Sequence, residues 1–149
     1  MRIKFTALGE PQGKGRPIFS TYGGRVSART PEKTVEYENR IMAVYRRANP
    51  GTKFPDGAML DLRVVAFYGI PASASNKLRM AMLAGEVRPT KKPDADNILK
   101  AVADSLNGLA YRDDAQIVDT QVRKFYSAQP RIEVTIQETG GVSYEQMQL

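Results

Sequence analysis

Residues 93–108 read PDADNILKAVADSLNG, and their pattern is that of one helix with two different faces. Apolar residues recur at helical spacing, which predicts a helix with Asp94 at its N-cap and Gly108 at its end. The apolar positions are Ile98, Leu99, Val102 and Leu106. Polar residues three or four apart form a stripe on another face of the same helix. This stripe consists of Asp96, Lys100, Asp104 and Asn107.

Strand patterns lie on both sides of this helix in the sequence. Residues 2–8 and 131–137 alternate between apolar and polar side chains, as half-buried strands do. Residues 58–70 are apolar almost throughout, which predicts a central strand. A further strand is expected at roughly 116–126, and it should pair with 131–137 as a hairpin at the end of the fold.

The remaining elements complete the expected fold. A short hairpin over 18–28 would turn at Gly23-Gly24, and a helix would follow with Thr30 as its N-cap. A second, shorter helix is expected within 73–86. These elements predict a single α+β domain over residues 1–138, a mixed β-sheet packed with two to three helices. Residues 139–149 show no period and are expected to form a flexible tail.

The composition excludes several kinds of chemistry. The 149 residues include no cysteine and no histidine, so disulfides, thiolate nucleophiles, zinc–thiolate sites and serine–histidine triads are all absent. A metal held by this chain would have oxygen ligands, which favours magnesium, manganese or calcium. The aspartate spacing does not match the calcium loop of an EF-hand. No apolar run is long enough to span a bilayer and no signal peptide is evident, so the expected location is the cytoplasm.

The charge is spread unevenly along the chain. Residues 1–53 contain 11 Lys and Arg against 4 Asp and Glu, and residues 54–92 contain 6 against 3. Residues 93–149 reverse the balance, with 5 basic and 9 acidic residues. A basic surface serves solubility in many proteins, but a basic first two-thirds also suits a polyanionic partner such as nucleic acid.

Five aspartates lie between residues 94 and 114, and each has an ordinary explanation when taken alone. The helix dipole favours acidic residues in the first turn by about 0.3–1 kcal/mol, and aspartate is common in turns. Crowded together, however, the like charges repel one another, and a divalent cation is the usual reason to tolerate this. Carboxylates, a metal ion and a nearby lysine are the groups that a phosphodiesterase needs. The pattern therefore indicates a metal-dependent phosphodiesterase acting on nucleic acid.

Two segments carry a resemblance to a known family. KKPDADNILKAVADSLNG (91–108) and AYRDDAQIV (110–118) resemble the RusA family of Holliday-junction resolvases, which phages and prophages often carry. The basic segments PQGKGRP (11–17) and YGGRVSARTPEKTVEYE (22–38) are similar to the first loops and first helix of that family. IPASASNKLR (70–79) also resembles it, although Ala74 stands where the family often has an aromatic residue. The resemblance extends from about residue 5 to residue 136.

The resemblance implies a small dimeric enzyme that cuts four-way DNA junctions by paired, symmetric nicks and needs Mg²⁺ or Mn²⁺. By residue match, Asp94, Asp96 and Asp114 would be catalytic carboxylates that bind the metal, with Asp113 in support. Lys100 would be the catalytic lysine, and Asn97 would have a structural or indirect role. A two-fold dimer also suits a junction with two equivalent scissile strands, because it presents two active sites in one binding event.

Basic residues outside the aspartate motif are expected to contact the DNA backbone. Residues 11–31 contain no acidic residue, and four of their side chains are cationic. These are Lys14, Arg16, Arg25 and Arg29. Lys91 and Lys92 immediately precede the aspartate motif and are expected to act in the same way.

Two other functions remain open from the sequence. One is a junction- or DNA-binding protein whose acidic cluster is structural and that never cuts its ligand. The other is a general Mg²⁺-dependent nuclease with no preference for junctions.

Overall fold

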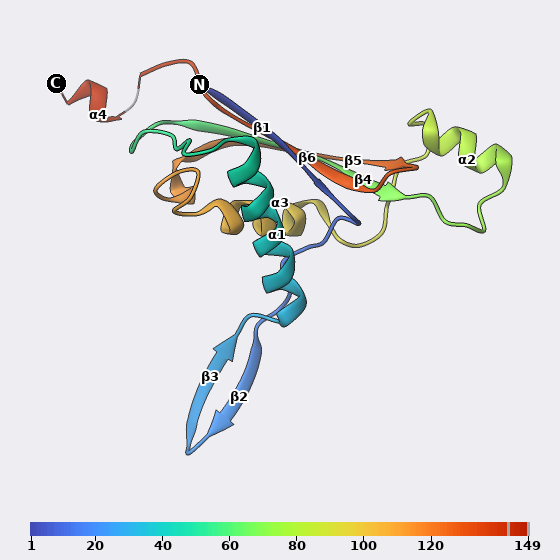
Figure 1. Cartoon of the computed structure of the whole chain (residues 1–149), viewed down its shortest axis with the longest axis horizontal. Helices are drawn as coiled ribbons and strands as arrows, with labels where there is room; N and C mark the ends of the chain where they lie inside the picture. Colours follow the sequence, from blue (N-terminus) through green and yellow to red (C-terminus); the bar gives the residue numbers. More distant parts are fainter. Residues whose placement is uncertain (143, 149) are drawn as a thin grey trace.

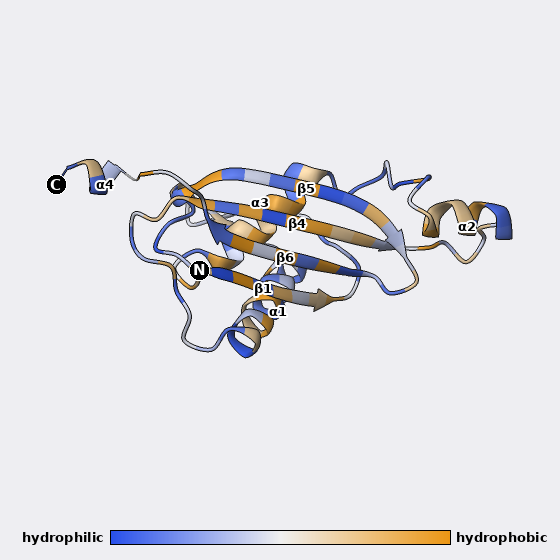
Figure 2. Ribbon diagram, turned by 90° about the horizontal axis from the view of Figure 1, so that it is seen from above, coloured by the Kyte–Doolittle hydropathy of each residue, from blue (hydrophilic) through white to orange (hydrophobic). Residues whose placement is uncertain are grey.

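A four-stranded mixed sheet forms the centre of the computed structural model, which describes residues 1–142 and 144–148. The strands lie in the order β1-β6-β4-β5, as Figure 2 shows from above. β6 is antiparallel to both β1 and β4, whereas β4 and β5 run parallel. The expected mixed sheet and its central strand β4 are therefore confirmed. The strand bounds are β1 Arg2–Leu8, β4 Leu60–Gly69, β5 Ile117–Ser127 and β6 Arg131–Glu138.

The expected hairpin at the end of the fold is wrong, because β4 lies between β5 and β6. β5 ends at Ser127 beside Gly69, and the chain passes over the end of β4 before β6 begins. The chain is close-packed at Gly69, where a Cβ would collide with the Glu10 carboxylate and lie 3.2 Å from the Pro130 ring. The short connection resembles a hairpin loop, but both strands pair with a strand that comes earlier in the chain.

Two helices cover one face of the sheet and pack against each other (Figure 1). They are α1 (Glu32–Ala48) and α3 (Ala95–Leu106). α1 starts one residue later than the sequence predicts, with Pro31 at the N-cap and no side-chain cap. The buried faces of both helices meet the inward side chains of the sheet in one core. Each large apolar side chain buried there contributes about 1.5–3 kcal/mol.

A two-stranded arm projects from the body at the start of α1 (Figure 1). It consists of β2 (Ile18–Tyr22) and β3 (Arg25–Arg29), and every residue of both strands is exposed. Gly23 and Gly24 have φ angles of 58° and 78°, the left-handed conformation that a tight hairpin turn requires. The hairpin predicted at this position is confirmed.

The remaining helices are short. α2 (Asn76–Leu83) lies beyond one end of the sheet and contacts β5 (Figure 1). A 3-10 turn, η1 (Asp114–Gln116), precedes β5, and α4 (Tyr144–Met147) lies close to the C-terminal end. Within the described part of the chain, no helix combines the length and apolarity needed to cross a membrane.

Candidate active site

The polar stripe predicted on α3 is present and faces away from the core. Asp96 and Lys100 are exposed, whereas Ile98 and Val102 are buried on the opposite side. The ammonium of Lys100 lies 3.5 Å from Oδ2 of Asp104, one turn further along the helix. The helix thus holds its charged groups on one side because its apolar residues are buried on the other.

The start of the motif is held by two side chains from the sheet. The Tyr68 hydroxyl of β4 donates a hydrogen bond to the carbonyl of Pro93 at 2.5 Å. Burial, together with the nearby charge of Asp94, raises the pKa of Tyr68 to about 12, so this hydroxyl stays protonated. The ammonium of Lys124 in β5 donates to the carbonyl of Lys91 at 2.7 Å. These two bonds fix the chain that leads into Asp94.

Asp94 occupies the N-cap of α3, as expected, but its carboxylate makes no capping hydrogen bond. The residue is exposed, and its side chain lines the basic groove described below. The charge of Asp94 also acts on Lys124, whose pKa is lowered by burial despite that opposing effect. A cation therefore lies near Asp94 on the neighbouring strand.

The turn after α3 brings the aspartate pair back towards the helix. The Tyr111 hydroxyl donates to the carbonyl of Ala103 at 2.7 Å, and the backbone N–H of Asp114 donates to Oδ1 of Asn107 at 3.0 Å. Asp113 uses its carboxylate to cap η1, accepting a hydrogen bond from the N–H of Ala115. Asp113 therefore shapes the turn, while Asp114 faces the C-terminal half of the stripe.

Negative charge accumulates around Asp114. Burial raises the pKa of its carboxyl, and the adjacent Asp113 and then Asp104 raise it further. Lys100 acts in the opposite direction. The ionised forms of Asp104 and Asp114 therefore repel each other, and the ammonium of Lys100 relieves part of that repulsion.

The first basic loop (residues 11–17), which we call the strap, lies across α1 and α3. The N–H of Lys14 donates to the carbonyl of Asn97 at 3.2 Å, and the N–H of Gly15 donates to Oγ1 of Thr34 at 3.1 Å. Both glycines are needed for this approach. A Cβ at Gly13 would lie 2.6 Å from the Asn97 side chain, and one at Gly15 would lie 2.5 Å from Thr34.

The side chain of Lys14 points between the two helices rather than into open solvent. Its ammonium lies 2.9 Å from Glu38 of α1 and 3.3 Å from Asp104 of α3. Burial lowers the pKa of Lys14, but the bonds and charges of these carboxylates outweigh it and leave the pKa above its ordinary value. Lys14 therefore differs from the other cations expected to contact DNA, because two carboxylates already hold it.

A groove of about 550 Å³ joins this strap to the start of the motif. Among the described residues, cationic side chains dominate its charged lining, and Asp94 is the one carboxylate. Asn97 also lines it, beside Pro93. The cations are Lys14, Arg16, Lys33 and Lys92. A concave basic surface suits the phosphate backbone of a nucleic acid. The exposed carboxylate of Asp94 would then lie beside the bound phosphates.

The arginines of the arm lie on one face of it. Ser20 and Ser27 contact each other across the strands at 3.0 Å, so they share a face. Arg25 and Arg29 lie two residues to either side of Ser27 and therefore project from the same face. The arm and the groove together contain Arg16, Arg25, Arg29 and Lys92, and Lys91 is exposed next to Lys92.

The described residues place Asp94 and Asp96 at one part of α3 and Asp114 near another. Asp94 and Asp96 lie at the start of α3, whereas Asp114 lies near Asp104, which is about 15 Å along the helix from Asp94 at 1.5 Å per residue. Among residues 1–142 and 144–148, no group of three or more acidic, histidine or cysteine side chains could hold a metal ion. Among the described residues the three aspartates therefore form no preformed cage. The arrangement fits a Mg²⁺ ion whose coordination is completed by substrate phosphates and water.

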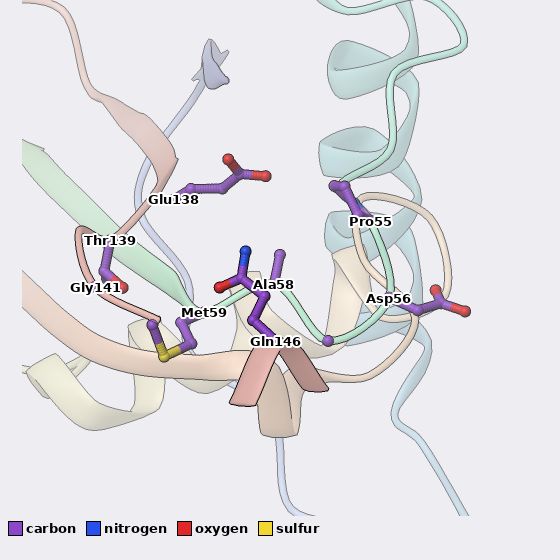
Figure 3. Close-up of a pocket in the computed structure, with 9 residues that line it drawn as sticks. Pro55, Asp56, Ala58, Met59, Glu138, Thr139, Gly141 and Gln146 are labelled. Carbon is purple, nitrogen blue, oxygen red and sulfur yellow. The ribbon is translucent and has the colours of Figure 1, made fainter. Parts of the chain in front are cut away.

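A second cavity lies on another part of the molecule, between the loop after α1 and the C-terminal segment (Figure 3). Its volume is about 320 Å³, and the charged residues that line it in the described part of the chain are Asp56 and Glu138, with no lysine or arginine. Figure 3 shows these two carboxylates on opposite sides of the cavity. Such a lining repels a polyanion, so the basic groove is the better candidate for the DNA-binding site.

Two residues near the site were not among the sequence-based candidates. The sequence could have indicated Asp104, because it follows Lys100 by four residues on the polar stripe. No local sequence pattern indicates Lys124, since only the parallel pairing of β4 with β5 brings it beside Tyr68 and Lys91.

Comparison with known proteins agrees with the motif. The family model described as Endodeoxyribonuclease RusA matches residues 9–137. The chain is also 42% identical over 138 residues to the Uncharacterized protein YqaN of Bacillus subtilis (strain 168). That match covers 91% of this chain and 96% of the relative. The chain belongs to the RusA family of endodeoxyribonucleases.

Proposed function

We propose that this protein resolves four-way DNA junctions by paired, symmetric nicks that depend on Mg²⁺, for which Mn²⁺ can substitute. The observation that carries the proposal is the basic groove that contains Asp94 and Asn97 of the family motif. Membership of an endodeoxyribonuclease family supports DNA as the substrate. A DNA substrate puts the enzyme in the cytoplasm of a bacterial host, at the nucleoid.

The carboxylates have the central role in the proposal. Asp94, Asp96 and Asp114 would hold the ion together with phosphate oxygens of the DNA, and Asp113 would support Asp114 by shaping its turn. When bound, Mg²⁺ would supply Lewis-acid polarisation of the scissile phosphate. Asp94 supports this role, because it is exposed and its carboxylate makes no capping hydrogen bond, which an acidic N-cap commonly makes.

Lys100 is the proposed catalytic lysine. Its ammonium is exposed and lies one helical turn from Asp96. A cation held in this place can stabilise the charge that develops on the phosphate during cleavage. The ion pair with Asp104, at 3.5 Å, leaves the side chain of Lys100 largely exposed and thus accessible to a phosphate.

The arm and the groove would hold the DNA backbone. Arg16 and Lys92 line the groove, Lys91 adjoins it, and Arg25 and Arg29 project from one face of the arm. Lys14 would contribute mainly through its fixed charge at the groove wall. A two-stranded ribbon is narrow enough to enter the major groove of B-DNA, which supports the arm as a DNA-binding element.

A homodimer is part of the proposal. Two symmetric cuts within one binding event require two active sites related by a two-fold axis, as a four-way junction itself has. Sedimentation of the protein with and without junction DNA measures this directly, and a monomer bound singly to each junction would contradict it.

A labelled four-way junction, incubated with and without Mg²⁺ beside a matched linear duplex, tests the proposed activity. We expect paired nicks in the junction only when Mg²⁺ is present. Binding without any cut would identify a junction-binding protein. Equal cutting of junction and duplex would identify a general nuclease.

A further inference from the structure

We propose that Lys14 and Asp104 are positioning residues, which together fix the ammonium of Lys100 at the polar stripe. The inference rests on the proposed function, because it assigns a role within the same site. It concerns residues that do not touch the reacting phosphate and act through Lys100.

A continuous series of ion pairs links α1 to Lys100. Glu38 of α1 and Asp104 of α3 lie 2.9 Å and 3.3 Å from the ammonium of Lys14. The same Oδ2 atom of Asp104 lies 3.5 Å from the ammonium of Lys100. Both lysines thus contact the same carboxylate, that of Asp104.

The side chains in this series of ion pairs differ in their exposure to solvent. The side chains of Lys14 and Asp104 are 21% and 25% exposed, whereas that of Lys100 is 62% exposed. A long exposed lysine otherwise samples many rotamers, and an isolated helical ion pair would restrain it only weakly. Because Lys14 holds Asp104 in place, Asp104 presents a fixed anchor to Lys100.

The strap explains why the loop has the sequence Gly13-Lys14-Gly15. The backbone of Lys14 is bonded to Asn97, and a side chain at either glycine would collide with Asn97 or Thr34. A loop of this kind delivers the lysine to a defined place between two helices. A lysine kept only for phosphate contact would not need two glycines pressed against α1 and α3.

The test is a double-mutant cycle on single-turnover junction cleavage and junction affinity. Lys14→Ala and Asp104→Asn should each lower the cleavage rate by about 10- to 100-fold, because a misplaced group has effects of this size. Affinity should change by less than about threefold, as the polar contacts of Lys14 are within the protein. The double variant should be no slower than either single variant, and Lys14→Arg should restore most of the rate. Lys53→Ala, at an exposed lysine outside the groove, is the matched control.

A second readout is independent of cleavage. The NMR signal of the Lys100 side-chain ammonium, assigned with Lys100→Arg, should move in Lys14→Ala and in Asp104→Asn but not in Lys53→Ala. Circular dichroism establishes that each variant is folded. An unmoved Lys100 signal overturns the inference, as does a loss of affinity that equals the loss of rate. If the wild-type protein never cuts a junction, the proposed function fails. The NMR signal still decides whether Lys14 and Asp104 position Lys100.

Discussion

The ammonium of Lys14 lies 3.3 Å from Oδ2 of Asp104, although the two residues belong to distant parts of the sequence. This contact joins the first basic loop to the polar stripe of α3. The side of the molecule expected to hold DNA is thereby coupled to the side expected to cut it.

Lys100 should act on the rate of cleavage and not on the affinity for DNA. Lys100→Ala removes a cation that stabilises charge on the phosphate, so the single-turnover rate should fall by about 10²–10³-fold. Junction affinity, measured by electrophoretic mobility shift, should fall far less. A rate loss that merely follows the loss of affinity would remove Lys100 from the chemistry.

The arm should contribute to binding of any DNA sequence. Arg25→Ala/Arg29→Ala removes two proposed phosphate contacts, and each contact changes the slope of log affinity against log salt by about one unit. The slope should therefore become flatter by about two units, while the position of the cut stays the same. Arg46→Ala/Arg47→Ala is the control of equal charge, because these arginines lie in the last turn of α1, at the other end from the arm. An equal effect of both double variants would mean that only net charge matters.

Asp114 should lower the stability of the folded protein at neutral pH. The pKa of its carboxyl is raised by burial and by Asp113 and Asp104, so the folded state binds a proton more readily than the unfolded state. The ionised carboxyl is therefore destabilising, and stability falls as the pH rises through the raised pKa. Asp114→Asn should unfold at a higher temperature than the wild type at pH 7. The difference should vanish below about pH 4, where the unfolded aspartate is also protonated.

The close approach of the strap should be sensitive to a single methyl group. Gly13→Ala places a Cβ 2.6 Å from the Asn97 side chain, and overpacking of this kind costs about 1–3 kcal/mol in the free energy of unfolding. Gly140→Ala is the matched control, because a Cβ there has no atom within 4 Å and its φ is not in the left-handed region. Urea unfolding of both variants measures the difference. Equal stability would show that the strap is not pressed against α3 in solution.

Local patterns in the sequence predicted the parts of the fold that depend on local geometry. The stripe Asp96, Lys100, Asp104 was readable because a helix repeats every 3.6 residues, and the turn of the arm was readable from Gly23-Gly24. The pairing of β5 was not readable. A parallel partner is chosen by packing between distant segments, and a short loop before β6 is compatible with several pairings.

The candidate site divides in the same way. The family motif gave the aspartates and the lysine, but nothing in the sequence gave the partners of Lys14, since Glu38 and Asp104 meet it only when α1 and α3 pack together. That Asp94, Asp96 and Asp114 bind one metal ion stays a prediction. In the fold, Asp94 is at the N-cap of α3 and makes no capping hydrogen bond. Binding of Mg²⁺ also depends on the phosphates of the DNA, which the fold of the protein alone does not supply.

The most direct test of the account is the cleavage rate of Asp94→Asn on a four-way junction in Mg²⁺, measured beside Asp119→Asn. Asp119 is an exposed carboxylate on β5 outside the groove, so it controls for the loss of one negative charge. We predict that Asp94→Asn binds the junction as tightly as the wild type or more tightly, because a negative charge near phosphate is removed. It should make no detectable nick, while Asp119→Asn should cut at the wild-type rate. Cleavage by Asp94→Asn at the wild-type rate would contradict the account, because the groove would then lack its reactive carboxylate.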